Sequence, residues 1–306
     1  MARLASEPTP VRIGIDLGGT KSEVIALDSS GETLFRRRKP TPADDYAAIL
    51  DTLCRLVAEA EASAGRRGRL GMATPGAVSQ SSGRLKNSNT VALNGRRPDL
   101  DLAERLGRDV RLENDANCFA LSEAVDGAGA QARVVLGVIL GTGVGGGLIV
   151  DRHILHGRNR IAGEWGHNPL PWPSAEELPG PPCYCGRRGC IETFLSGPGL
   201  ARDFEARTGV GSSAEDIVGA ARDGSAPARA CLTAYLDRLA RGLATVINVL
   251  DPEVIVLGGG LSNITELYRE LPCRLSRYTF SDTFDTPIVP AVHGDSSGVR
   301  GAAWLA

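Results

Sequence analysis

The stretch Val11–Leu27, VRIGIDLGGTKSEVIAL, decides the fold. Its first part alternates apolar residues with polar or small ones, which is the two-residue period of a β-strand. The segment Gly18-Gly19-Thr20-Lys21 interrupts this pattern, and 22–27 resumes it. A short turn then leads to a third strand-like segment, 32–38. We therefore predict a three-strand meander with a glycine hairpin between its first two strands.

A helix is expected directly after the meander. Apolar residues between Ile49 and Ala60 recur at helical spacing, and Asp44 or Asp45 can cap the helix at its N-terminus.

The strand, glycine turn and strand pattern occurs a second time. Residues 134–140 are apolar, Gly141-Thr142-Gly143 interrupts the run, and Leu148-Ile149-Val150 resumes it with the spacing of the first unit. This predicts two homologous halves facing each other. The alternative, that two unrelated hairpins look alike over ten residues, stays open at this point.

The C-terminal part adds a helix and a buried strand. An amphipathic stripe predicts a helix over 232–250, a strand follows over 254–257, and Gly258-Gly259-Gly260 then turns the chain. The segment 170–182 is rich in proline and predicts a surface loop. Alternation of strands and helices indicates an α/β protein whose ligands bind where strands end in glycine turns.

Composition excludes several classes of protein. The 306 residues suffice for two domains, and 34 basic against 36 acidic residues give a net charge of -2, so nucleic acid is a poor candidate partner. The basic run Arg36–Lys39 is predicted to be a solvated strand end. The uncharged run 134–150 is only at the lower limit of length for a membrane span and contains six glycines, so we interpret it as two strands and a loop. Residues 1–10 lack an apolar secretory segment, so we expect a cytoplasmic protein with reduced cysteines.

Glycine turns between strands can present backbone N–H groups to phosphate oxygens. Three turns qualify, those beginning at Gly18, Gly141 and Gly258, although a turn of this kind is often only a turn. Gly141, Gly143 and Gly146 fit the pattern G-x-G-x-x-G, but a strand rather than a helix follows them, so a dinucleotide site is excluded. The P-loop motif is absent from the sequence.

One cluster of residues has the spacing of a metal site. His167, Cys183, Cys185 and Cys190 offer four ligands around a tight turn, which suits tetrahedral structural zinc. The alternative is three core cysteines and a hydrogen-bonded histidine. The other cysteines are expected in the core, and they are Cys54, Cys118, Cys231 and Cys273.

Carboxylates are the candidates for acid or base catalysis. Asp115 stands at an expected helix start, where it is either a catalytic carboxylate or simply an N-cap. Glu164 and Glu192 flank the candidate zinc ligands. Asp16 lies in an apolar strand before a glycine turn, an unusual place for a charge unless a cation or phosphate needs it.

Six motifs resemble the ROK family of sugar kinases within the actin-like ATPase superfamily, nearly along the whole chain. These are DLGGTK (16–21), ENDANC (113–118), GTGVGGG (141–147), GEWGH (163–167), CYCGRRGCIE (183–192) and LGGGLS (257–262). The stretches around GEWGHNPLPW and GCIETFLSG are most similar to bacterial fructokinases of the mannokinase/fructokinase type. The resemblance implies an actin-like fold of duplicated ribonuclease H-like domains with a cleft between them, the domains being 1–113 plus 293–306 and 114–292.

The resemblance also implies roles for individual residues. ATP would be bound by Gly18, Gly19, Thr20, Lys21, Gly141, Thr142, Gly143, Gly145, Gly146, Gly259 and Gly260, with Asp16 near Mg²⁺ and the transferred phosphoryl group. Asp115 would be the general base. Asn114, Asp115, Glu164, His167 and Glu192 would hold the sugar, and His167 would serve the zinc as well.

The implied activity is transfer of the γ-phosphate of ATP to the 6-hydroxyl of fructose, with mannose as a further acceptor. N-Acetylglucosamine or glucose is the alternative acceptor within the family. A sugar-responsive transcriptional repressor is the non-enzyme alternative, and it is disfavoured because ten residues before Val11 are too few for a helix-turn-helix domain. The expected partners are the sugar and ATP, without nucleic acid or membrane, in a chain that could form a homodimer.

Overall fold

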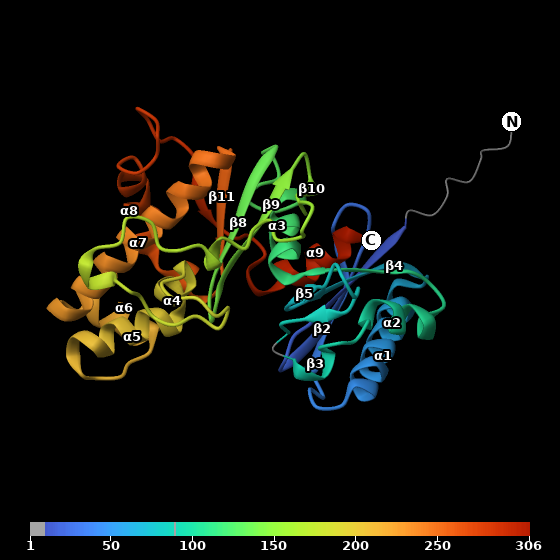
Figure 1. Cartoon of the computed structure of the whole chain (residues 1–306). Helices are drawn as coiled ribbons and strands as arrows, with labels where there is room; N and C mark the ends of the chain where they lie inside the picture. Colours follow the sequence, from blue (N-terminus) through green and yellow to red (C-terminus); the bar gives the residue numbers. More distant parts are fainter. Residues whose placement is uncertain (1–9, 89) are drawn as a thin grey trace, which may run out of the picture. The chain divides into compact units, whose positions relative to one another are not determined.

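The computed structural model describes residues 10–88 and 90–306, which form two compact units (Figure 1). The first unit contains the described residues up to Asp126 together with 295–306, and the second contains Gly127–Gly294. The segment on which the expectation about a secretory leader rests lies outside the described residues, apart from Pro10.

A mixed five-stranded sheet forms the centre of the first unit. Its strands, in spatial order, are β3 (Thr33–Pro40), β2 (Lys21–Leu27), β1 (Val11–Leu17), β4 (Gly68–Thr74) and β7 (Val110–Asn114). The pairs β1–β2 and β2–β3 are antiparallel, whereas β4 pairs in parallel with β1 and with β7. The predicted meander is confirmed.

Helices cover this sheet, and two short strands accompany it. The helices are α1 (Tyr46–Ala64), α2 (Pro98–Leu106), α3 (Asp115–Val125) and α9 (Ser297–Leu305), and β5 (Ala77–Val78) pairs with β6 (Leu85–Lys86). Asp45 caps α1 by accepting a hydrogen bond from the Ala48 N–H, as one of the two predicted caps.

The second unit repeats the sheet order of the first. Its strands, in spatial order, are β10 (His153–Ile154), β9 (Val144–Val150), β8 (Val134–Leu140), β11 (Val254–Gly258) and β12 (Ile288–Pro290). In both sheets an antiparallel hairpin is followed by two parallel neighbours. The shared order confirms the predicted duplication.

The helices of the second unit are α4 (Ile191–Leu195), α5 (Gly197–Thr208), α6 (Ala214–Arg222), α7 (Ala226–Leu250) and α8 (Thr265–Leu275). The long helix α7 contributes Tyr235, Leu239 and Leu243 to the core, and its middle part, 238–244, is buried on all sides. Among the described residues, no helix of either unit has both the length and the apolar character that a membrane crossing requires.

The position of helix α3 differs from the predicted domain boundary. The sequence placed residue 114 at the start of the second domain, but α3 belongs to the first unit. The physical reason is its packing against α9, where the α carbon of Gly301 faces the backbone of Cys118. Cys273 is a second correction, because it is exposed on α8 rather than buried like Cys118 and Cys231, while Cys54 is partly buried.

Close backbone contacts fix α9 on the first sheet. A Cβ added to Gly14 in β1 would lie 2.0 Å from the carbonyl oxygen of Val299, and one added to Gly71 in β4 would lie 1.9 Å from that of Ala302. On the other side of α9, a Cβ at Gly301 would lie 1.7 Å from the Cys118 carbonyl oxygen. All three positions therefore require glycine.

We predict that Gly301→Ala destabilises the protein by about 2 kcal/mol or more, because the new methyl group must push α3 and α9 apart. Gly219→Ala is the matched control, since Gly219 also lies in a helix but a Cβ there meets nothing within 4 Å. That control should be neutral or stabilise by about 0.5–1 kcal/mol. Urea unfolding of both variants checks this, and an equally stable Gly301→Ala protein would contradict the packing described above.

Candidate functional site

The first glycine turn joins β1 to β2. The Gly18 N–H donates to the Lys21 carbonyl oxygen at 3.0 Å, and Lys21 is exposed at the start of β2. Within the described residues, the N–H groups of Gly19 and Thr20 find no acceptor. Two free amides beside an ammonium group are suited to an anion such as a phosphate.

Two carboxylates of the first unit, those of Asp16 and Asp115, repel each other electrostatically. Asp16 is near the end of β1, and Asp115 is the first residue of α3. Burial, and then the carboxylates of Asp115 and Glu23, raise the pKa of Asp16 to about 7, while Arg38 opposes this shift. A divalent cation would relieve the repulsion between the two acids, so the pair is suited to hold one.

Asn114 is the N-cap of α3. Its side-chain oxygen accepts from the Ala116 N–H at 2.8 Å, and its amide nitrogen donates to the Gly76 carbonyl oxygen at 2.9 Å. The alternative that Asp115 serves as the N-cap is therefore wrong. Asp115 follows the cap, in the first turn of α3. Its carboxylate also accepts from the Ala116 N–H, at 2.9 Å.

Glu23 is a residue that the sequence analysis missed. It is 3% exposed, pairs across the strands with Asp16, and accepts hydrogen bonds from Arg36 and from Arg38. The basic run 36–39 is therefore not simply a solvated strand end, because two of its side chains neutralise a buried acid. The sequence did contain a signal for Glu23, because a charged residue inside the apolar run of β2 is unusual.

The second glycine turn joins β8 to β9 in the other unit. Gly141 N–H donates to the Gly143 carbonyl oxygen at 3.0 Å, and Thr142 is exposed at the tip. Glu192, in the first turn of α4, accepts from the Val144 N–H at 2.9 Å. A Cβ at Gly143 would lie 2.7 Å from the same carboxylate, so a larger residue there would displace the Glu192 side chain.

Other glycines of the predicted nucleotide set lie in different surroundings. Gly145 and Gly146 are inside β9 rather than in the turn, and Gly146 is packed under Trp165. Gly259 has a positive φ of 82° and lies against the backbone of Leu140, whereas a Cβ on Gly260 would meet nothing. The strand over 144–150 agrees with the rejection of a dinucleotide motif.

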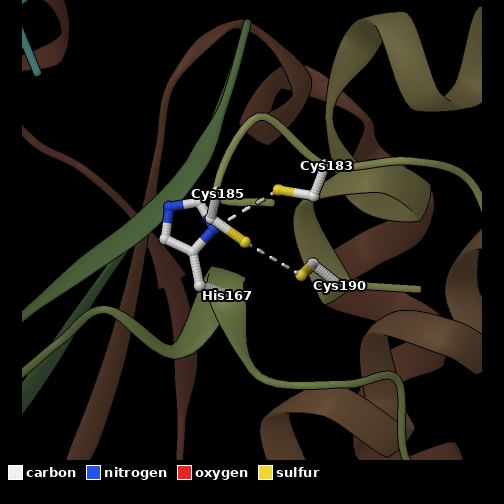
Figure 2. A group of neighbouring side chains, drawn as sticks. All are labelled: His167, Cys183, Cys185 and Cys190. Carbon is white, nitrogen blue, oxygen red and sulfur yellow. Dashed lines mark hydrogen bonds between the residues drawn. The ribbon is translucent and has the colours of Figure 1, made fainter. Parts of the chain in front are cut away.

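The four predicted zinc ligands come together (Figure 2). Their ligand atoms all lie within 4.8 Å of one another, with 3.6 Å between Cys183 Sγ and His167 Nδ1 and 3.6 Å between Cys185 Sγ and Cys190 Sγ. Tetrahedral zinc with bonds of about 2.3 Å places sulfur atoms about 3.8 Å apart. The four residues therefore fit a zinc ion. Burial raises the pKa of Cys190 to about 12, so a bound cation is what would hold its thiolate form.

The two ring nitrogens of His167 have different neighbours. Its Nδ1 faces Cys183, and its Nε2 lies 2.9 Å from the hydroxyl of Tyr184. Tyr184 is 77% exposed, yet partial desolvation and then the nearby carboxylates of Glu192 and Glu164 raise its pKa to about 12. The structure thus brings Glu164, His167 and Glu192 together around Tyr184, which sequence analysis missed although it lies between two ligand cysteines.

A small polar hollow adjoins this group. It has a volume of about 140 Å³, and its lining includes Thr142 of the glycine turn, Tyr184, Glu192 and Arg202 of α5. Within the second unit, the hollow connects a predicted phosphate contact with the predicted sugar contacts.

The loop between His167 and Cys183 is anchored to α7. Glu177 accepts hydrogen bonds from Arg238 at 2.7 Å and from Arg241 at 2.8 Å, and Arg241 also donates to the carbonyl oxygens of Pro171 and Trp172. Burial alone would raise the pKa of Glu177, but these two arginines outweigh it and lower the pKa to about 2. The predicted surface loop is therefore fixed by buried ion pairs.

Comparison with known proteins identifies the family. The model of the ROK family matches residues 12–306. N-acetyl-D-glucosamine kinase of Salmonella paratyphi C is 42% identical over 296 residues, which cover 95% of this chain and 98% of the relative. This finding supports a sugar kinase but not the particular resemblance to fructokinases.

Two solved structures share the fold along nearly the whole chain. The ROK hexokinase of Thermus thermophilus has a TM-score of 0.87 at 31% identity and covers 97% of both chains. A ROK family glucokinase of Streptomyces griseus, in complex with glucose and AMPPNP, has a TM-score of 0.76 at 28% identity and covers 97% of this chain and 99% of its own. With the repeated sheets and the paired glycine turns described above, these matches show that the chain belongs to the ROK family and is an ATP-dependent sugar kinase with the actin-like ATPase fold.

Proposed function

We propose that this protein transfers the γ-phosphate of ATP to the 6-hydroxyl of a hexose, with Asp115 as the general base. The observation that carries the proposal is the place of Asp115, in the first turn of α3 and beside the enclosed carboxyl of Asp16. An ionised carboxylate at this position can accept the proton of a sugar hydroxyl.

The remaining residues would hold ATP and the sugar in position and balance the charge of the phosphates. The free amides of Gly19 and Thr20, and the Lys21 ammonium, would bind phosphate oxygens in the first unit, and the turn at Thr142 would do so in the second. Asp16 would hold Mg²⁺, which neutralises charge on the phosphate oxygens during transfer. Glu164, His167 and Glu192 would hold the sugar hydroxyls, since carboxylates accept hydrogen bonds and the imidazole can donate or accept one.

Asn114 has a more limited part in this proposal than the resemblance implied. Both ends of its side-chain amide already serve the backbone, at Ala116 and Gly76. The Nδ2 group retains one hydrogen and Oδ1 retains one lone pair for a sugar hydroxyl. Its structural role is to cap α3, which begins at Asp115.

We propose N-acetylglucosamine as the first acceptor to test and fructose, with mannose, as the second. The Salmonella relative named above is an N-acetyl-D-glucosamine kinase, and the likeness spans 95% of this chain. The resemblance to fructokinases is confined to the stretches around 163–172 and 183–197. The longer likeness therefore outweighs the expectation of fructose.

Initial-rate measurements with ATP and each sugar decide between these acceptors. We expect the largest kcat/KM for N-acetylglucosamine, because a pocket shaped for the acetamido group loses contacts with a sugar that lacks it. A larger value for fructose would restore the original expectation, and no ATP consumption with any hexose would refute the proposal.

Asp115→Asn should lower kcat by about 10² to 10⁴, because the amide cannot accept the proton. Binding of ATP and of the sugar should be retained, since the neighbouring contacts remain. Asp99→Asn is a matched control, as Asp99 also lies in the first turn of a helix of the same unit. A fully active Asp115→Asn enzyme would exclude Asp115 as the base.

We also propose that the four-ligand cluster binds structural zinc. Elemental analysis should find about one zinc per chain, one for each four-ligand cluster. The zinc would be structural because three cysteines and one histidine leave no ligand position for water. Cys185→Ser should lose the metal and stability, whereas Cys273→Ser, which changes an exposed cysteine on α8, should keep both. Metal-free protein with full activity and stability would contradict this assignment.

A further inference from the structure

The turn between β1 and β2 is an incomplete hairpin. In a closed two-residue hairpin, the residues that flank the turn exchange two hydrogen bonds. Here the Gly18 N–H donates to the Lys21 carbonyl oxygen at 3.0 Å, but the reverse bond, from Lys21 to Gly18, is not formed. The Gly18 carbonyl oxygen has a different partner.

That partner is Thr41, one residue beyond β3. Its hydroxyl donates to the Gly18 carbonyl oxygen at 2.8 Å, and its N–H donates to the Thr20 carbonyl oxygen at 3.0 Å. Thr41 lies between Pro40 and Pro42. Proline at both neighbours restricts the backbone there and favours an extended conformation at Thr41, which limits its freedom to turn away.

These two bonds fix the direction of the turn's amide groups. A trans peptide is planar, and its N–H points opposite to its C=O. Since the Gly18 carbonyl points toward Thr41, the Gly19 N–H must point away from it. The Gly19 N–H, which has no acceptor within the described chain, is thus turned to the side opposite Thr41.

Ser22 supports Thr41 from behind. The two hydroxyl oxygens are 2.8 Å apart, and Ser22 is 1% exposed. The single hydroxyl proton of Thr41 is used on Gly18, so Ser22 must be the donor in this pair. The result is a chain of hydrogen bonds that runs from Ser22 through Thr41 to Gly18.

We infer that Thr41 is a positioning residue for the phosphoryl donor, because it keeps the Gly18–Lys21 turn open with the free Gly19 N–H directed to the phosphates. The inference rests on the proposed use of ATP at this turn. Without the Thr41 hydroxyl, the Gly18 carbonyl is free to accept from the Lys21 N–H. The turn then closes and its amides change direction.

The test compares Thr41→Val with Thr41→Ser. Valine keeps the shape and removes the hydroxyl, so the Kd and KM for MgATP should rise about tenfold, the size of one ordinary hydrogen bond's free energy, while the KM for the sugar stays within about twofold. Serine keeps the hydroxyl and should restore nucleotide binding. Thr286→Val is the matched control, since the Thr286 hydroxyl also donates to a distant carbonyl, that of Pro252, in the other unit.

Calorimetric titration of the intact protein with MgATP separates the outcomes. Wild-type protein that binds no MgATP refutes the proposed function itself. Wild-type binding with unchanged affinity in Thr41→Val overturns the inference alone, and so does an equal loss for sugar and nucleotide, which indicates general damage. Ser22→Ala should weaken MgATP binding less than Thr41→Val and add nothing in the double variant, because both act through one chain of bonds.

Discussion

Backbone-to-backbone contact between α9 and the first sheet is the constraint on which the first unit depends. Gly14 and Gly71 let the carbonyl oxygens of α9 reach the strands, and Gly301 lets α3 reach α9 on the opposite side. The start of α9 lies against Asp16, where a Cβ at Gly298 would be 3.3 Å from the carboxylate. The separation of Asp16 and Asp115 is therefore set by main-chain packing, which has little freedom to relax.

The second unit secures its polar residues by a different combination of forces. Its loops also use glycine contacts, since a Cβ at Gly163 would lie 2.1 Å from the Gly146 carbonyl oxygen and one at Gly166 would lie 2.0 Å from that of Val144. The cysteine and histidine cluster fixes one side of the segment after His167, and Glu177 fixes the other through Arg238 and Arg241. Such double anchoring gives rigidity to a segment that has almost no regular secondary structure.

Local patterns made much of the fold predictable from the sequence. The hairpins at Gly18 and Gly141, the cap at Asp45 and the ligand spacing around Cys185 all depend on residues close in the chain. The domain boundary was wrong because α3 is held by α9, which is nearly two hundred positions away in the sequence. The polar partners were missed for a different reason. The pairing of Glu23 with Arg38 depends on strand register and that of Tyr184 with His167 on the path of a loop, so neither follows from spacing along the chain.

Residues in contact in the first unit are far apart in the order of synthesis. The chain leaves this unit after Asp126, forms the whole second unit, and returns at residue 295 to supply α9. Until that helix emerges from the ribosome, Ile25 and Leu27 lack their partners Val299 and Ala303, and one face of the sheet remains uncovered. The second unit is continuous in sequence, so it can fold before α9 has been synthesised. A helix translated after the whole second unit therefore completes the first unit, and a nascent chain stalled before it presents an apolar sheet face that chaperones can recognise.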